Sequence, residues 1–234
     1  MRGGGRSCVK IPLVMQDPPF SVTHELAGWD LFWARLETIP GRDEALADLR
    51  RRAGERARAG WNGEGLAGDP TVAALRSLFR AAGCDPTRYR PSSEALIRRL
   101  LKGDDLPAIH PLVDLNNCLS VALAVPCCIV AEGSFTPPVV LRAGRAGESY
   151  ESLRGPFNLE GKPLLADAEG PFGTPITDSQ RVKVTGDTRG AWIVAYLPAG
   201  VVAPEAAAKA LDDLLAGAAV ATVAENGASR GEAR

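Results

Sequence analysis

Two stretches of the sequence hold side chains that suit hydrogen-bonding or acid–base chemistry. The first places an imidazole, a carboxylate and two adjacent amides within eight residues, at His110, Asp114, Asn116 and Asn117. The second combines hydroxyl, acidic and basic groups within ten residues, at Thr174, Asp178, Ser179, Arg181 and Lys183. Groups of these kinds can position a water molecule, polarise a carbonyl or hold an anion.

Each residue of the first stretch also has a structural interpretation. His110 precedes a predicted helix and could hold a water or a hydroxyl at a pocket mouth, or it could be an exposed loop histidine. Asp114 lies one helical turn further on and could contact His110, or it could only complement the helix dipole. Asn116 and Asn117 are poor residues for a helix interior, so one of them is expected either to bind a ligand or to satisfy a buried backbone group.

The second stretch reads as a polar turn that leads into a strand at residues 181–184. Asp178 could bind an ammonium group, and Arg181 and Lys183 could contact phosphates. Alternatively, Asp178 and Ser179 form a turn that caps itself through local hydrogen bonds. Thr174 is expected in a pocket wall, where it could discriminate between ligand side chains.

Covalent and metal-dependent chemistry is disfavoured by what the sequence lacks. It has no G-x-S-x-G elbow at a predicted strand-to-helix turn, because its one such string, at residues 227–231, falls in the expected polar tail, and it has no convincing Ser-His-Asp spacing. Its five cysteines form no C-x-x-C pair and only two histidines accompany them, so neither a metal site nor a cofactor is expected. Cys127 and Cys128 lie in an apolar run and are interpreted as buried thiols.

Charge is nearly balanced overall but unevenly distributed. The formal net charge is −1, which argues against binding nucleic acid by bulk electrostatics. Between Arg50 and Lys102, however, 12 Lys/Arg accompany 5 Asp/Glu, a local charge of +7. This stretch could meet a polyanion through residues such as Arg98 and Arg99, or its arginines could simply solvate exposed helix faces.

The hydrophobic pattern predicts one domain over residues 20–223, between a frayed N-terminus at 1–19 and a polar tail at 224–234. Helices are expected at 43–60, 70–82, 92–102, 111–123 and 204–223, with Asp69 and Ser92 as caps. Short strands are expected at 22–26, 31–36, 127–131, 139–142, 164–167, 181–184 and 192–197. This order indicates an α+β or three-layer α/β fold with mixed sheets. No apolar run is long enough for a membrane helix, and a cytoplasmic monomer is expected.

Several of these segments, taken in order, resemble a known family. Residues 89–99 (YRPSSEALIRR) with 106–117 (LPAIHPLVDLNN) look like the central signature of freestanding relatives of the phenylalanyl-tRNA synthetase β-subunit editing domain. Residues 178–185 (DSQRVKVT) with Thr188-Arg189 resemble the family's second block, although Val182 stands where a threonine is expected. Residues 141–144 and 161–167 add weaker similarity, so the resemblance covers about 71–198.

The resemblance implies the editing-domain fold and a pocket for the aminoacyl end of a tRNA. It implies hydrolysis of mischarged aminoacyl-tRNA by a positioned water, as translation quality control, without a cofactor. In this interpretation the catalytic residues are His110, Asp178 and Asn117. Substrate-binding residues are Asp114, Asn116, Thr174, Ser179, Arg181 and Lys183, and Arg98 and Arg99 bind tRNA. Two alternatives stay open: a non-catalytic tRNA- or protein-binding module of the same fold, and a hydrolase of another small aminoacyl conjugate.

Overall fold

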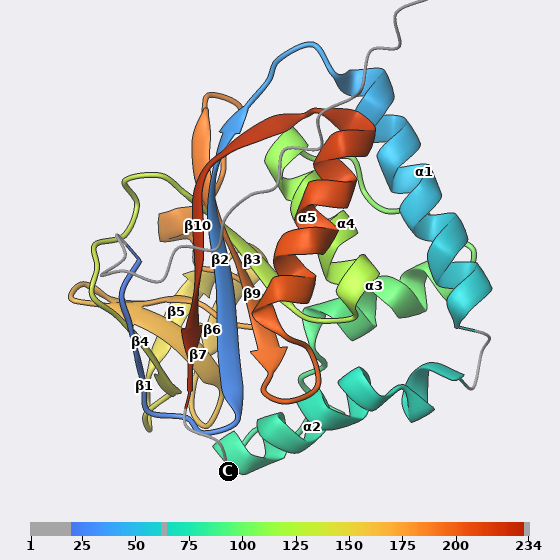
Figure 1. The fold of residues 1–234 in the computed structure, drawn as a ribbon. Helices are drawn as coiled ribbons and strands as arrows, with labels where there is room; N and C mark the ends of the chain where they lie inside the picture. The colour runs from blue at the N-terminus through green and yellow to red at the C-terminus, as the bar shows by residue number, and fades with distance from the viewer. Residues whose placement is uncertain (1–19, 62–64, 232–234) are drawn as a thin grey trace, which may run out of the picture.

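The computed structural model describes residues 20–61 and 65–231, which form a mixed α and β architecture (Figure 1). The predicted fold class is confirmed. Its helices are α1 (Asp43–Gly60), α2 (Pro70–Ala82), α3 (Ser92–Leu101), α4 (Pro111–Leu123) and α5 (Pro204–Ala218), with short 3-10 helices at Gly65–Gly68 and Gln180–Val182. Its strands are β1 (Val22–His24), β2 (Trp29–Thr38), β3 (Cys127–Ala131), β4 (Val139–Ala143), β5 (Ser149–Ser152), β6 (Gly155–Asn158), β7 (Pro163–Asp167), β8 (Gly170–Gly173), β9 (Gly190–Pro198) and β10 (Ala221–Arg230).

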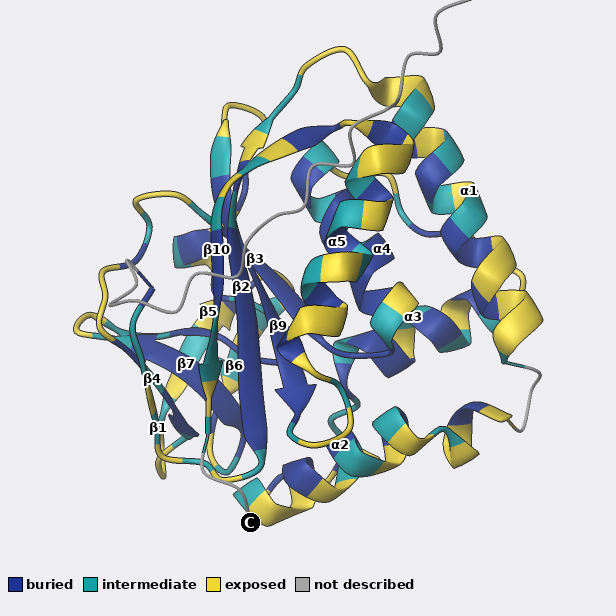
Figure 2. Cartoon of the chain, viewed as in Figure 1, coloured by how far each residue is buried: buried dark blue, intermediate teal, exposed yellow. Residues whose placement is uncertain are grey.

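A central antiparallel sheet divides the molecule into layers. Its strand order is β10-β2-β9-β3, and β2 pairs with both β9 and β10 along almost its whole length. Helices α1, α4 and α5 cover one face, and a second sheet of order β1-β4-β7-β8 lies on the other side (Figure 1). Figure 2 shows that burial is concentrated in the central sheet and in the helix faces turned toward it, as a shared hydrophobic core requires.

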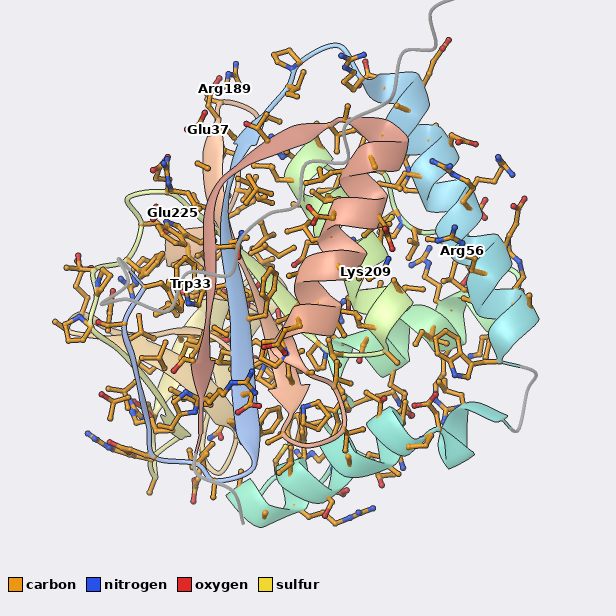
Figure 3. All side chains as sticks on the ribbon, in the orientation of Figure 1. Trp33, Glu37, Arg56, Arg189, Lys209 and Glu225 are labelled. Atoms are coloured by element: carbon orange, nitrogen blue, oxygen red, sulfur yellow. The ribbon has the colours of Figure 1, made fainter. Side chains whose placement is uncertain are left out.

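Aromatic side chains fill the space between the two sheets. Trp33 lies on the side of the central sheet that faces away from α5 (Figure 3), with its ring centroid 5.6 Å from that of Trp192. Phe135 contacts Trp192 edge-on and stacks on Phe172 of β8 at 5.2 Å. These rings bury a large apolar area and join the layers, so they fix where β8 and the loop after it lie.

Local signals place two of the helices that matter for the site. Asp69 caps α2 by accepting hydrogen bonds from the N–H groups of Thr71 and Val72, and Gly83 ends that helix with φ 97°. Pro111 opens α4 directly after His110, whose Nδ1 accepts from the N–H of Leu112 at 3.2 Å. Both helices begin where the sequence predicts.

Four local predictions are wrong. Ser92 does not cap α3, because the cap position is Pro91 and no side chain bonds there. Residues 181–184 are not a strand, since Ser179 accepts a hydrogen bond from the N–H of Arg181 and starts a 3-10 turn. The last helix ends at Ala218 and not at residue 223. The expected tail from 224 is instead mostly strand β10, which runs to Arg230 beside β2.

The remaining expectations concern thiols, membranes, metals and the chain ends. Cys127 and Cys128 are buried, as interpreted. Cys84 and Cys118 are buried as well, and burial raises the pKa of the Cys84 thiol to about 11. Among the described residues no helix combines the length and apolar character needed to cross a membrane. Within the same residues no group of three His, Cys, Asp or Glu side chains is arranged to hold a metal ion. The expectations for residues 1–19 and for residues 232–234 lie outside the described part of the chain.

Candidate active site

A cleft of about 740 Å³ opens between α3, the start of α4, and the loops that follow β5 and β8. It brings together seven of the residues singled out in the sequence: Arg98, Arg99, Asn116, Asn117, Thr174, Asp178 and Lys183. Its volume falls in the range of about 300–1,000 Å³ typical of ligand sites. The two polar stretches, about 60 residues apart in the chain, therefore contribute to one concave surface.

The wall of the cleft is strongly basic. Seven cationic side chains line the cleft, compared with only two acidic ones, Asp104 and Asp178. The cationic residues are Arg88, Arg90, Arg98, Arg99, Lys102, Arg154 and Lys183. A concave surface with this excess of one charge concentrates ligands of the opposite sign, so it suits an anion.

Asp178 is a cleft residue with strongly perturbed electrostatics. Burial raises the pKa of its carboxyl to about 8, although hydrogen bonds from the backbone at Thr174 and Ile129 offset part of the effect. Its Oδ1 atom is shielded from solvent and has no hydrogen-bond partner. A carboxyl with a pKa close to neutral can accept a proton from water and release it again, which is what a general base needs.

The Asp178 carboxyl lies beside Gly173 of β8, near Tyr196 of β9. A Cβ atom at Gly173 would lie 3.4 Å from Asp178 Oδ1 and 3.4 Å from the hydroxyl oxygen of Tyr196. That hydroxyl is also buried without a hydrogen-bond partner. Two buried polar atoms without hydrogen-bond partners therefore lie beside the same glycine, next to the cleft.

The two asparagines line the cleft in different ways. Asn116 is buried and donates from Nδ2 to the carbonyl of Cys127 at 3.3 Å, which ties α4 to β3. Its Oδ1 has no partner, so the same side chain also presents an acceptor. Asn117 is half-buried and lines the cleft. The interpretation of one amide as a structural group therefore applies to Asn116.

Thr174 organises the loop that carries Asp178. Its Oγ1 accepts from the N–H groups of Ile176 and Thr177 and donates to the carbonyl of Thr177 at 2.6 Å. Tyr150 of β5 donates to the same carbonyl at 2.5 Å. The N–H of Ser92 donates to Pro175 O at 2.9 Å, which fixes the start of α3 to this loop. The two walls of the cleft are therefore connected.

Two other predicted site residues, Asp114 and His110, do not line the cleft. Asp114 is buried, forms an ion pair with Arg50 of α1 and accepts from the N–H of Ile109 at 2.9 Å. His110 caps α4, and burial lowers the pKa of its imidazole. Both residues hold the segment that precedes Asn116 and Asn117.

Arg181 and Ser179 are also engaged elsewhere. Arg181 forms a bidentate pair with Asp167 at 2.9 and 3.1 Å and a further ion pair with Glu169, both near β7 and β8. Ser179 caps the 3-10 helix, as the alternative of a self-capping turn predicted. Neither side chain is part of the cleft wall, so the expectation that Arg181 contacts a phosphate there is not supported by its position.

Sequence patterns gave no indication of Glu94 as a member of the site. Glu94 is buried at the first turn of α3 and accepts from Arg76 at 2.9 and 3.0 Å and from Arg98 at 2.8 Å. Arg90 forms a third ion pair with it at 3.4 Å. From the sequence, its place in the first helical turn suggests only a favourable interaction with the helix dipole. The ion pair with Arg76 could not be predicted, because Arg76 lies on another helix.

The chain is similar to known proteins both in sequence and in fold. Residues 74–213 match the family model of the B3/4 domain, so the chain belongs to the B3/4 domain family. Among solved structures, an N-terminal fragment of the phenylalanyl-tRNA synthetase β subunit from Pyrococcus horikoshii is similar, with 15% identity and a TM-score of 0.46. The alignment covers 94% of this chain and 52% of that one, so this chain spans about half of the fragment. A comparison with curated proteins finds no match. The family recognised from the sequence is confirmed.

Proposed function

We propose that this B3/4 domain hydrolyses the ester bond of mischarged aminoacyl-tRNA in the cleft. The observation that carries the proposal is the combination of a buried carboxyl that has a pKa of about 8 and one oxygen without a hydrogen-bond partner, and a wall of seven cationic side chains. The first can activate water, and the second suits the phosphates that flank an aminoacylated 3′ end. The resemblance to synthetase editing domains supports the same substrate.

In the proposed reaction the carboxylate of Asp178 takes a proton from a bound water. The water oxygen bonds to the ester carbonyl carbon, while the amide of Asn117 donates a hydrogen bond to the carbonyl oxygen as it gains charge. The bond between that carbon and the ribose oxygen then breaks, and the ribose oxygen takes the proton that Asp178 received from water, which regenerates the carboxylate. Because an aminoacyl ester is already activated, this positioning suffices without a covalent intermediate.

The remaining polar residues take supporting roles in this proposal. Asn116 and Thr174 shape the part of the cleft that receives the amino acid, and Arg98, Arg99 and Lys183 meet phosphates. His110 and Asp114 act as positioning residues, because they fix the start of α4 and hence Asn117. The basic wall favours a nucleic-acid conjugate over a small aminoacyl conjugate, which has no row of phosphates to neutralise.

A panel of mischarged tRNAs tests the proposal. Each is incubated with the wild-type protein and with Asp178→Asn, and release of the amino acid is followed above the spontaneous rate. Hydrolysis of at least one member by the wild type, slowed in the variant, is the expected result. If every member binds and none is hydrolysed above background, the protein is a non-catalytic tRNA-binding module.

A further inference from the structure

A second cavity, of about 230 Å³, lies between α1, α4 and α5, the helices that cover one face of the central sheet (Figure 1). We call it the helix pocket, and it shares no lining residue with the cleft. Its floor consists of the buried residues Leu49, Ala53, Ala57, Cys118, Val121 and Leu214. A cavity of about 150 Å³ already accepts a benzene ring. The helix pocket therefore has room for one aromatic ring or a short aliphatic chain.

Small residues at the contact between the helices leave this space open. Ala53, Ala57 and Gly60 follow one another at intervals of four and three residues, so they lie on one face of α1. Ala122 of α4 is another small residue, and it lies exposed at the mouth. Side chains of ordinary size would fill such a contact, because protein interiors are close-packed. The alanines and the glycine instead leave apolar surface that a ligand can cover.

Trp61 supplies an aromatic wall directly after α1. Its Nε1 donates to Asp69 at 3.0 Å, which fixes the half-buried indole at this end of the pocket. The other three tryptophans, Trp29, Trp33 and Trp192, are buried in the core and do not line the pocket. Trp61 therefore offers an aromatic surface to a ligand, and its fluorescence can report on occupancy of the pocket.

The charged residues at the mouth leave one positive charge uncompensated. Arg52, Arg56 and Asp213 line the pocket. Arg52 pairs with Asp48 at 3.1 Å, and Asp213 pairs with Lys209 at 2.6 Å. Arg56 forms no ion pair or hydrogen bond within the described part of the chain. An unpaired guanidinium beside an apolar cavity complements a ligand that joins one anionic group to an apolar body.

We infer that the helix pocket binds a small monocarboxylate with an apolar body. The carboxylate lies on Arg56, whose planar guanidinium can donate two parallel hydrogen bonds to it. The apolar body lies against Trp61 and the alanines of α1. A neutral compound of the same shape fills the pocket equally well but leaves Arg56 without a partner, so it binds more weakly. The inference does not depend on the proposed function, because the pocket and the cleft are built from different residues.

Two compounds of the same shape test the inference, 3-phenylpropionate and its neutral counterpart 3-phenylpropanamide. Isothermal titration calorimetry on the wild-type protein should show one site for 3-phenylpropionate, with a Kd of about 1 mM or below, as expected for a ligand of this size. The amide should bind at least about 10-fold more weakly, because the charge-assisted hydrogen bonds are lost. 3-Phenylpropionate should also change the tryptophan fluorescence, and Trp61→Phe should remove that change. No saturable binding up to about 10 mM, or equal affinity for the two compounds, would overturn the inference.

Matched variants test where the ligand lies. Arg56→Met should weaken binding of 3-phenylpropionate about 10-fold and leave binding of the amide unchanged, a pattern that a merely structural role would not give. Arg80→Met, at an exposed arginine of α2 outside the pocket, should alter neither.

Ala122→Leu tests the cavity itself. Because Ala122 is exposed at the mouth, a larger side chain can enter the pocket without disturbing the core, and both compounds should lose binding. Ala81→Leu, at an exposed alanine of α2, is the control and should bind both as the wild type does. Melting curves establish that each variant is folded. Wild-type affinity for 3-phenylpropionate in folded Arg56→Met and Ala122→Leu would refute the inference.

Discussion

Asp178 Oδ1 and the hydroxyl oxygen of Tyr196 flank the same glycine: each would lie 3.4 Å from a Cβ atom at Gly173. Both atoms are buried and lack hydrogen-bond partners. An unpaired buried polar group costs about 1–3 kcal/mol, so this arrangement reduces stability in the absence of ligand. The same lack of partners leaves the Asp178 carboxyl available for chemistry.

Gly173→Ala should lower activity while the fold is kept. The new methyl group would be in ordinary van der Waals contact with Asp178 Oδ1 and Tyr196, and Gly173 is not in the left-handed region. The unfolded chain would lose entropy, which favours the folded state by about 0.4–1 kcal/mol. Ester hydrolysis should slow, because the methyl group restricts and further desolvates the carboxyl. Melting temperature and single-turnover rate are the readouts, with Gly68→Ala, at a glycine with open space around it, as the control.

Asp178→Asn should stabilise the protein, and more so at high pH. Burial raises the pKa of the folded-state carboxyl from 3.8 to about 8, so between those values the folded protein retains a proton that the unfolded chain releases. The wild type therefore loses stability as pH rises from about 4 to about 8, and asparagine removes that loss. Melting temperatures at pH 5 and pH 8.5 should show a larger gain for the variant at pH 8.5. A gain that is equal at both pH values would contradict the raised pKa.

Arg98 and Arg99 should respond differently to charge reversal. The sequence interpretation treats them as equivalent residues of one helix face, but Arg98 donates to the buried Glu94. Arg98→Glu should therefore destabilise the fold by at least about 1 kcal/mol, since it places a second carboxylate beside the first. Arg99→Glu should leave the melting temperature nearly unchanged and weaken tRNA binding, most clearly at low salt. Filter binding over a salt series measures this; unaltered affinity in Arg99→Glu would remove that side chain from the interface.

His110 offers a test of positioning against catalysis. Because its Nδ1 caps α4, His110→Ala should cost about 1 kcal/mol of stability and slow hydrolysis by displacing Asn117. His110→Asn supplies another capping side chain and should restore both properties. Rates are compared well below the melting temperature of either variant. If the asparagine variant is folded and as slow as the alanine variant, the imidazole itself takes part in the reaction.

Local signals were sufficient where the chain's own neighbours determine the structure. Asp69, Pro70 and Gly83 mark the bounds of α2 through capping and backbone conformation, and the structure agrees. Strand β10 escaped prediction because its partner β2 lies about 190 residues earlier, and an alanine-rich sequence after α5 favours a helix. Pairing along a long edge outweighs that local propensity.

In the candidate site, too, residues recognised by local motifs could be predicted, whereas contacts with distant residues could not. Asp178 and the two asparagines were found through motif order, and all three line the cleft. The spacing of Asp114 from His110 suggested a contact between the two, yet its ion-pair partner Arg50 lies 64 residues away. Tyr196 and Glu94 gave no signal, since the significance of each depends on residues of other elements. Motif order identified residues that line the cleft, but not the partners that hold a side chain elsewhere or leave one without a hydrogen bond.

The most direct test of the account is the single-turnover release of amino acid from a mischarged tRNA by the wild type and Asp178→Asn across pH 6 to 9. With the spontaneous rate subtracted, the wild-type rate should rise with pH and level off near the pKa of about 8 set by burial of Asp178. The variant should be slower by about 10-fold to 1,000-fold, with no such rise, as expected for loss of one acid–base group. A variant that matches the wild type in rate and pH dependence would contradict the account.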